Sequence, residues 1–189
     1  TTNINLQERQ KLDFLKYEGP TDPIYTGSLG NVFSYKGFHL NVFMTYSFGN
    51  VLRLDPVFKA AYNDLSSMTK VFRNRWMRGG DELTTNVPTI IDRYRNKKTN
   101  NIERAYSAYN LSNVRVAKGD FIRLKEVSLT YDFPKAWLSS TPINNLSLKL
   151  QATNLCLLYA DSKLNGQDPE FFNTGGVASP MPKQFTLTV

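Results

Sequence analysis

Cysteine and histidine are nearly missing from this chain of 189 residues, which has one of each. Cys156 alone excludes an internal disulfide and a cysteine-based zinc cluster. His39 alone excludes a histidine-rich metal site and leaves one candidate for a His-centred catalytic triad. The chain also has no glycine-rich phosphate loop and no nucleophile elbow. We therefore expect a protein that is not an enzyme and that needs no cofactor or metal ion.

Long apolar runs are absent as well. The longest, Leu155 to Ala160, is far shorter than the run of about 18 residues that suggests a transmembrane helix. The first residues, Thr-Thr-Asn-Ile-Asn, do not form a signal peptide and include no Met. The chain therefore has the character of an inner part of a longer protein.

The charge is unevenly distributed. The chain has 23 Lys and Arg against 16 Asp and Glu, a net charge of +7. A basic excess of this size suits nucleic acid or an anionic surface. Much of it falls between Lys70 and Lys98, in a segment that has the composition of a loop. We therefore expect no nucleic-acid partner.

Strict alternation of apolar and polar residues is the strongest pattern. From Phe38 to Phe48 every second residue is large and apolar, and most residues between them are small or polar. A strand directs successive side chains to opposite faces, so this pattern predicts a strand with one apolar and one polar face. The turn Lys36-Gly37 joins it to a preceding strand over 24–35 and places Tyr35 opposite Phe38.

Three further strands are predicted after Gly119, and a helix before it. Val127, Leu129, Tyr131 and Phe133 share one face of a strand that ends at Pro134. Alternation then returns in the segments 146–160 and 184–189. Asp55-Pro56 has the pattern of a helix cap, and apolar residues spaced by three and four continue to Trp76. This predicts an amphipathic helix that ends near Gly79-Gly80, followed by an irregular loop from Asp81 to Leu111.

The connections between these strands alternate between short and long. Short ones lie at 36–37 and 135–145, and long ones at about 50–118 and 161–179. This is the layout of an outer-membrane β-barrel, in which strands of roughly 9–11 residues cross the bilayer. The expected fold class is therefore all-β, an antiparallel transmembrane barrel segment of about five strands. A soluble β-sandwich with one buried face has the same periodicity and remains the alternative.

Six short motifs occur along the chain between about Asp22 and its last residue, and their order and spacing are informative. They are Tyr35-Lys36-Gly37-Phe38; Arg75-Trp76 with Gly80-Asp81 and Val87-Pro88; the run GDFIRLKEVSLTYDFP from Gly119 to Pro134; Asn154-Leu155; GQDPE from Gly166 to Glu170; and PMPKQF from Pro180 to Phe185. Together they resemble the SusC/RagA family of TonB-dependent outer-membrane transporters. Lys183 departs from the Arg that is frequent there, and the chain stops at Val189, short of the family's terminal aromatic residue.

The resemblance implies both a place in a larger protein and a function. It makes the chain the last strands of a barrel of roughly 22 strands, with extracellular loops at about 50–118 and 161–179 and with the plug domain and TonB box outside this sequence. It implies import of oligosaccharides or peptides across the outer membrane of Bacteroidota. The implied partners are a SusD-like surface lipoprotein that acts as a lid, the TonB complex, membrane lipid and the substrate.

Two groups of residues are candidates for function. Aromatic and Arg side chains of the first long loop suit contacts with a substrate or the lid protein, or alternatively pin the expected helix to the barrel rim. This first group is Phe72, Arg75, Trp76, Arg93 and Tyr94. The second group consists of polar strand residues expected to face the lumen: Asn41, Thr45, Glu126, Ser128, Thr130, Lys149 and Gln151.

Some residues have a plainer interpretation. Asp168 and Glu170 suggest a calcium site or a glycosidase pair, but the Pro between them favours turn capping. We expect His39 to be a structural strand residue and Cys156 to be a packed thiol. Two other functions stay open for the chain, a secreted β-sandwich module that binds carbohydrate and, less favoured, a glycan-processing enzyme.

Overall fold

The computed structural model describes residues 13, 15–57, 69–89, 102–172 and 181–189. The chain divides into two compact units. Unit 1 consists of residues 1–19 and 53–116, and unit 2 of residues 20–52 and 117–189. The first expected long loop therefore supplies most of a separate compact unit.

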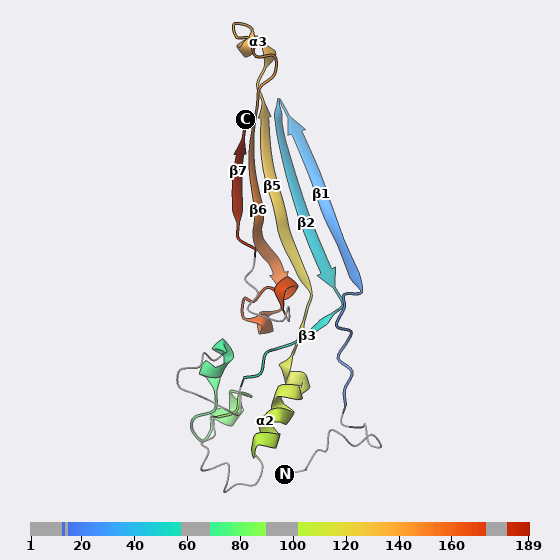
Figure 1. Cartoon of the computed structure of the whole chain (residues 1–189). Coiled ribbons are helices and arrows are strands. Elements are labelled where there is room, and N and C mark those ends of the chain that lie inside the picture. The colour runs from blue at the N-terminus through green and yellow to red at the C-terminus, as the bar shows by residue number, and fades with distance from the viewer. Residues whose placement is uncertain (1–12, 14, 58–68, 90–101, 173–180) are drawn as a thin grey trace. The chain divides into compact units, whose positions relative to one another are not determined.

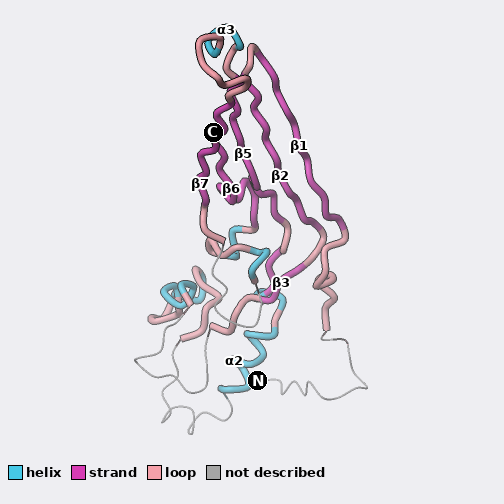
Figure 2. The backbone as a smooth tube through the Cα atoms, turned by 45° about the horizontal axis from the view of Figure 1, so that its top comes forward, coloured by secondary structure: helices cyan, strands magenta, loops and turns pink. Residues whose placement is uncertain are grey.

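Unit 2 is built around one antiparallel sheet of five strands in the order β1-β2-β5-β6-β7 (Figures 1 and 2). Each strand pairs with the next long strand in the chain, so the sheet is a meander. The all-β prediction is confirmed, and the strands lie where alternation placed them. They are β1 (Tyr25–Tyr35), β2 (Phe38–Phe48), β5 (Phe121–Asp132), β6 (Ser147–Ala160) and β7 (Gln184–Thr188).

The remaining elements are short. In the described residues no helix is long and apolar enough to cross a membrane. A second, two-stranded sheet pairs β3 with β4. The short elements are β3 (Val51–Arg53), η1 (Lys70–Asn74), η2 (Asp81–Leu83), α2 (Ile102–Leu111), η3 (Asn113–Arg115), β4 (Val116–Lys118), α3 (Lys135–Leu138), η4 (Ser162–Leu164) and η5 (Pro169–Phe171).

The register separates the side chains of the sheet onto two faces. Cross-strand partners point to the same side of a sheet, so the pairing Phe38↔Tyr131↔Leu148 and the pairing Leu40↔Leu129↔Leu150↔Leu187 define one side, the apolar face. The pairing Asn41↔Ser128↔Gln151↔Thr186 defines the other side, the polar face. Met44 lies on the apolar face as well, because it is an even number of residues from Phe38 along β2.

A β-bulge at Lys125 lets β5 keep its two faces. Phe43 pairs with Glu126 and the next residue, Met44, pairs with Leu124, so Lys125 has no partner on β2. Apolar residues of β5 fall at odd numbers from Val127 onward, whereas Ile122 and Leu124, before the bulge, have even numbers. Because a bulge inserts one residue into one strand, it restores both halves to the same apolar face.

The hairpin between β1 and β2 has the predicted turn. Lys36 and Gly37 both have positive φ, 46° and 84°, as a two-residue type I′ hairpin requires. The carbonyl of Gly37 also accepts a hydrogen bond from the backbone N–H of Asp132, at 2.9 Å. A Cβ at position 37 would lie 2.9 Å from the carbonyl oxygen of Asp132, so Gly fits this turn for two reasons.

Gly119 and Asp120 fasten the end of β2 to the start of β5. The Asp120 carboxylate accepts a hydrogen bond from the backbone N–H of Gly49 at 2.7 Å, and Gly119 N–H donates to the Asn50 carbonyl at 2.9 Å. A Cβ on Gly119 would lie 2.3 Å from the Asn50 side-chain nitrogen. The Gly-Asp pair that opens the longest matching stretch therefore has a structural function at this strand end.

Unit 1 has a small core of its own. Val57, Phe72 and Val87 are buried together, and Val71 and Tyr109 pack against them. The α2 residues at 106 and 109 are both tyrosines, and the buried Tyr106 hydroxyl donates a hydrogen bond to the Thr89 carbonyl. Burial raises the pKa of Tyr106 to about 12.

The expected helix from Asp55 to Gly79-Gly80 is wrong over its described parts. Thr69 and Arg75 have extended backbone, with ψ near 146° and 151°, and only the short 3₁₀ helix η1 lies between them. The part at 58–68 lies outside the described residues. The segment from Asp81 to Leu111 was expected to be irregular, yet it contains α2. Short-range hydrogen bonds and packing around Phe72 override the apolar spacing that continued to Trp76.

Candidate functional site

The seven residues expected to line a lumen share the polar face. Asn41, Ser128 and Gln151 are aligned across β2, β5 and β6, and Thr130 pairs with Lys149. Thr45 lies opposite Arg123, and Glu126 opposite Thr153. The register thus brings residues from three strands onto one continuous surface. Their assignment to a lumen stays a prediction.

The two faces of the sheet have an unusual distribution of exposure. Large apolar side chains are exposed on the apolar face, with Leu150 at 53% and Leu29 at 59%. On the polar face, Ser47, Arg123 and Ser128 are buried. A soluble protein buries its apolar side and exposes its polar side. This sheet instead exposes large apolar side chains on one face and buries several polar ones on the other. Its apolar face is therefore a large patch that something else must cover.

A buried ion-pair group lies on the polar face. The Arg123 cluster consists of Arg123, Asp168 and Glu170, and it joins β5 to η5. One terminal nitrogen of Arg123 donates to both carboxylate oxygens of Asp168 at 2.5 Å. Its Nε lies 3.2 Å from a Glu170 oxygen. Arg123 is 5% exposed and Asp168 is 8% exposed, while Glu170 is partly open to solvent.

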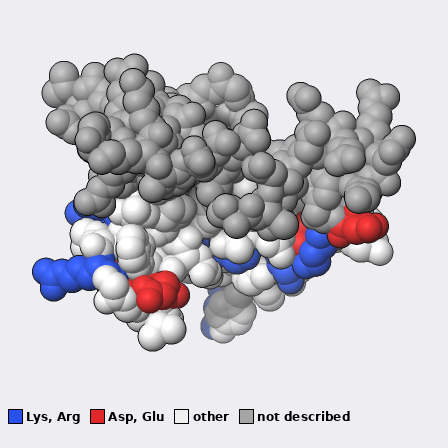
Figure 3. Space-filling model, turned by 90° about the horizontal axis from the view of Figure 1, so that it is seen from below, with Lys and Arg blue, Asp and Glu red and all other residues white. Residues whose placement is uncertain are grey.

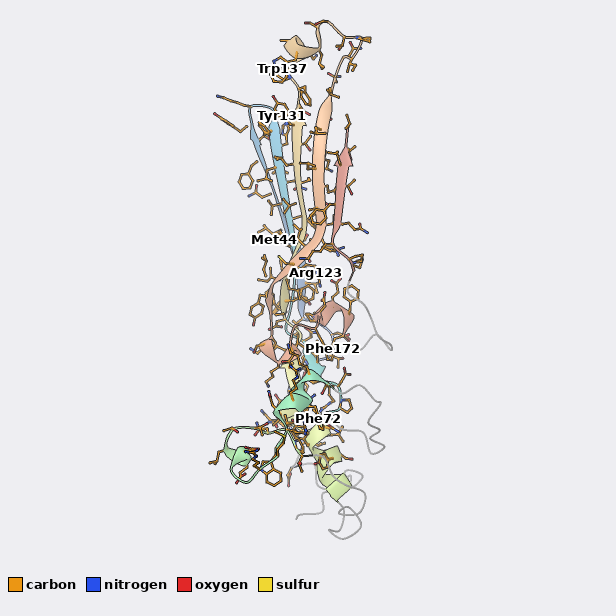
Figure 4. The ribbon with its side chains drawn as sticks, turned by 90° about the vertical axis from the view of Figure 1, so that its left-hand side faces the viewer. Met44, Phe72, Arg123, Tyr131, Trp137 and Phe172 are labelled. Carbon is orange, nitrogen blue, oxygen red and sulfur yellow. The ribbon has the colours of Figure 1, made fainter. Side chains whose placement is uncertain are left out.

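Asp168 also caps η5, because its Oδ1 accepts a hydrogen bond from the backbone N–H of Glu170 at 3.1 Å. The turn-capping interpretation of this residue is confirmed, and the ion pair with Arg123 is an addition to it. Asp161 acts similarly nearby, since its two carboxylate oxygens accept hydrogen bonds from the N–H groups of Lys118 and Lys163 at 2.8 and 2.9 Å. Figure 4 shows Arg123 toward the end of the strands at which Phe172 and its segment lie. The cluster therefore holds the segment 161–172 to β5.

His39 lies at the opposite end of the polar face, beside the hairpin. Its Nδ1 is 2.8 Å from the Ser34 hydroxyl, and its Nε2 is 3.1 Å from an Asp132 oxygen. These contacts bridge β1, β2 and β5. The structural interpretation of His39 as a strand residue fits this arrangement. Cys156 is different from its prediction, because it is exposed. It pairs with Leu124 on the apolar face, which no described layer covers.

The candidate contact residues of the first long loop have different environments. Phe72 is buried in the core of unit 1, so its ring is not available on the surface. Arg75 stacks on that ring, with its guanidinium carbon 4.9 Å from the centroid, and donates to the Phe72 carbonyl. Trp76 is partly exposed. Arg93 and Tyr94 lie outside the described residues.

Trp76 belongs to a tightly hydrogen-bonded turn, the Trp76 turn (residues 76–85). Its indole N–H donates to the Glu82 carboxylate at 2.9 Å, and the same oxygen accepts from the Gly80 N–H at 2.8 Å. Asp81 accepts from the N–H groups of Met77 and Arg78, at 3.0 and 2.9 Å. The turn presents Met77 and Leu83 as exposed apolar side chains. Sequence reasoning missed this turn, although Gly79-Gly80 followed by two acids was a signal for it.

Acid is expected to loosen the Trp76 turn. Hydrogen bonds from Met77 and Arg78 lower the pKa of Asp81 below 3.8, and the Trp76 indole lowers the pKa of Glu82 below 4.5. Groups with lowered pKa stabilise the fold above their unfolded pKa and lose that effect as pH falls through the folded one. We expect the NMR chemical shift of the Trp76 indole N–H to change in one titration step below pH 4.5, and we expect this step to be absent in Glu82→Gln. A chemical shift that does not change with pH in the parent protein would contradict this contact.

Charge on the described surface is mixed. In the space-filling view of Figure 3, described Lys and Arg side chains lie beside Asp and Glu side chains, and no broad field of one sign appears among them on that face. Some of the basic excess is also used internally. Arg115 is buried and donates to the Asp55 carbonyl at 2.5 Å, and Arg123 is paired with acids.

Comparisons with known proteins show similarity in fold. No family model matches the sequence, and no curated protein matches it. A chain of the RagAB peptide importer in the open-open state matches with a TM-score of 0.61 and 21% identity, over 91% of this chain. A chain of the same importer in the closed-closed state matches with a TM-score of 0.62 and 24% identity, over 91% of this chain. A structure of the RagAB peptide transporter matches with a TM-score of 0.56 and 24% identity, over 82% of this chain.

These matches involve a small part of each known protein. This chain covers 17% of the matched chains in the two importer states, and 15% in the third structure. At this level of identity the likeness shows a shared fold. The fold of this chain thus has a counterpart in these solved structures.

Proposed function

We propose that this chain forms part of the wall and loops of a TonB-dependent, SusC-like importer in the outer membrane of a bacterium of the Bacteroidota. The observation that carries the proposal is the reversed exposure of the sheet. Its apolar face exposes large side chains along four long strands, and its polar face holds the buried polar ones. Lipid on one side and an aqueous lumen on the other would account for both.

The lengths of the strands support this placement. β1 and β2 have 11 residues each, β5 has 12 and β6 has 14. A tilted transmembrane strand needs roughly 9–11 residues. Within the described residues β1 and β7 each pair on one side only. A closed barrel would supply strands to both edges.

The fold likeness and the sequence resemblance support a proposed substrate class and proposed partners. The matched structures are of a peptide importer, which supports import of peptides, and the resemblance adds oligosaccharides. A SusD-like lipoprotein would act as the lid and the TonB complex would supply energy. The proposal includes extracellular positions for residues 50–118 and 161–179, and no enzymatic activity or cofactor of this chain's own.

A soluble carbohydrate-binding sandwich is the alternative that the sequence left open. Such a module would cover the apolar face with a second sheet. In the part of the chain that the structure describes, Leu29, Leu129 and Leu150 remain exposed on that face. The observed exposure therefore favours the transporter proposal.

Cysteine labelling of the full-length protein in native membranes tests the proposal. Single cysteines at Asn41, Gln151, Val42 and Leu129 are placed in a Cys156→Ser background free of other cysteines. We expect a membrane-impermeant maleimide to label positions 41 and 151, on the polar face, and to label positions 42 and 129 at least tenfold more slowly. Deletion of the gene should also abolish uptake of fluorescent peptides or oligosaccharides. Equal labelling of the two pairs would reject the barrel-wall assignment.

A further inference from the structure

The connection between β5 and β6 folds as a small unit of its own. Pro134 ends β5, and the N–H of Trp137 donates to its carbonyl at 3.0 Å to begin α3. The hydroxyl of Ser139 donates a hydrogen bond to the carbonyl of Ala136 at 3.0 Å, and the hydroxyl of Thr141 donates one to the carbonyl of Leu138 at 2.9 Å. The turn is therefore held by local hydrogen bonds.

Within this unit the two large apolar side chains of α3 have opposite environments. Leu138 is buried, whereas Trp137 is 67% exposed. Burial of Leu138 explains how α3 is held in place. The exposure of Trp137, the largest side chain in the turn, is not explained by the packing of α3.

Trp137 is the last ring in a continuous row of aromatic side chains. The centroids of Phe38 and Tyr131 are 4.4 Å apart, those of Tyr131 and Phe133 are 5.0 Å apart, and those of Phe133 and Trp137 are 6.2 Å apart. Phe38 and Tyr131 pair on the apolar face. Figure 4 shows Tyr131 and Trp137 near each other at the end of the sheet where α3 lies. The row thus extends the apolar face beyond the last residues of the strands.

The charged residues of the β1–β2 turn and of α3 are positive. Lys36 lies in the β1–β2 turn and Lys135 is the first residue of α3, while the segment 133–146 contains no Asp or Glu. Asp132 is the nearest acid in sequence, and its carboxylate is held by His39, on the polar face. The Lys36 ammonium lies 5.2 Å from the centroid of the Tyr35 ring, and Tyr35 pairs with Phe38 of the row. This end of the apolar face therefore combines indole, phenol and ammonium groups, with Lys135 next to it in sequence.

We propose that α3 is a membrane anchor, in which Trp137 and Lys135 insert into the headgroup layer of the phospholipid leaflet at the short-turn end of the sheet. This inference rests on the proposed function, because it needs the apolar face to contact lipid. An indole has an apolar body and a polar N–H, so it prefers the boundary between acyl chains and headgroups. A nearby ammonium group adds attraction to anionic lipid. The anchor lies outside the strands and fixes their depth in the bilayer.

Depth-dependent fluorescence quenching of the full-length protein tests the anchor. The protein is reconstituted in phosphatidylethanolamine–phosphatidylglycerol vesicles whose acyl chains are brominated close to the headgroup. We expect Trp137→Phe to remove a measurable part of the lipid-dependent quenching. Trp76→Phe is the matched control, because Trp76 lies in the long segment 50–118, and it should leave the quenching unchanged. Lys135→Gln should reduce the gain in Trp137 quenching that added phosphatidylglycerol produces.

Each outcome has a defined meaning. If the barrel assembles and Trp137→Phe leaves the bromolipid quenching unchanged, the anchor is overturned while the proposed function stands. Quenching of Trp137 by aqueous acrylamide alone would overturn it in the same way, as would an indole packed against a neighbouring strand and reached by neither quencher. If no barrel assembles in vesicles, as judged by heat-modifiable gel mobility, the anchor and the proposed function both fail.

Discussion

Replacing Arg123 with methionine is expected to lower the free energy of unfolding by about 3–5 kcal/mol, the usual cost of breaking a buried ion pair from one side. The Asp168 carboxylate would lose two charge-assisted hydrogen bonds and remain buried without a counter-charge. Methionine keeps most of the side-chain volume, so little of the loss would come from a cavity. The measurement is urea unfolding of the full-length protein in vesicles.

The double variant Arg123→Met with Asp168→Leu is the control for this prediction. It removes both charges, so we expect it to recover much of the stability that the single variant loses. Glu170→Gln should cost about 0–1 kcal/mol, because Glu170 is partly open to solvent. If Arg123→Met lowered the free energy of unfolding no more than Glu170→Gln does, the ion pair between Arg123 and Asp168 would not be what holds the segment 161–172 to β5.

Charges placed on the two faces of β2 are expected to have very different effects. Val42 lies on the apolar face, opposite Asn31 and Val127, and Asn41 lies on the polar face, opposite Ser128. A charged residue at the midplane of a barrel's lipid-facing surface costs about 2–4 kcal/mol. We therefore expect Val42→Arg to lower stability by this amount and Asn41→Arg to have a much smaller effect. Folding of the full-length variants into vesicles measures both.

These two substitutions form a matched pair, because they introduce the same side chain at neighbouring positions of one strand. Val42→Lys and Asn41→Lys repeat the comparison with a different cation. Equal losses at positions 41 and 42 would show that the apolar face does not contact lipid, and the transporter proposal would then lose its main support.

The sheet could be predicted from the sequence because its pattern is local. Alternation from Phe38 to Phe48 and the Lys36-Gly37 turn together determine the strand, its register with β1 and its two faces. The same alternation predicts that Asn41, Ser128 and Gln151 lie on polar faces of their strands, and the register aligns them. Strand patterns with a period of two leave little freedom once one turn is identified.

The first long segment could not be predicted in this way. The apolar spacing from Phe58 to Trp76 predicts a helix, but Phe72 and Val87 form a core in which chain segments distant in sequence meet. Helix α2 was missed because Asp81 to Leu111 is polar overall. The tyrosines at 106 and 109 were a weak sign of one packed helical face. Tertiary contacts decide such segments more than local propensity does.

The Arg123 cluster was missed for a related reason. Asp168 and Glu170 were recognised as a capped turn, since that interaction spans two residues. The contact between Asp168 and Arg123 spans 45 residues, and no local sequence pattern predicts it. The change of apolar residues from even to odd numbers within β5 was a usable signal, because it implies a bulge and places Arg123 on the polar face.

The bulge at Lys125 makes β5 a strand of two independent halves. Residues 121–124 and 126–132 each keep their own alternation, and the bulge reconciles them. Gain or loss of a single residue at this point would exchange the two faces of one half and leave the other half unchanged. A one-residue insertion or deletion at this position can therefore alter the chemistry at one end of the sheet while the opposite end keeps its pattern.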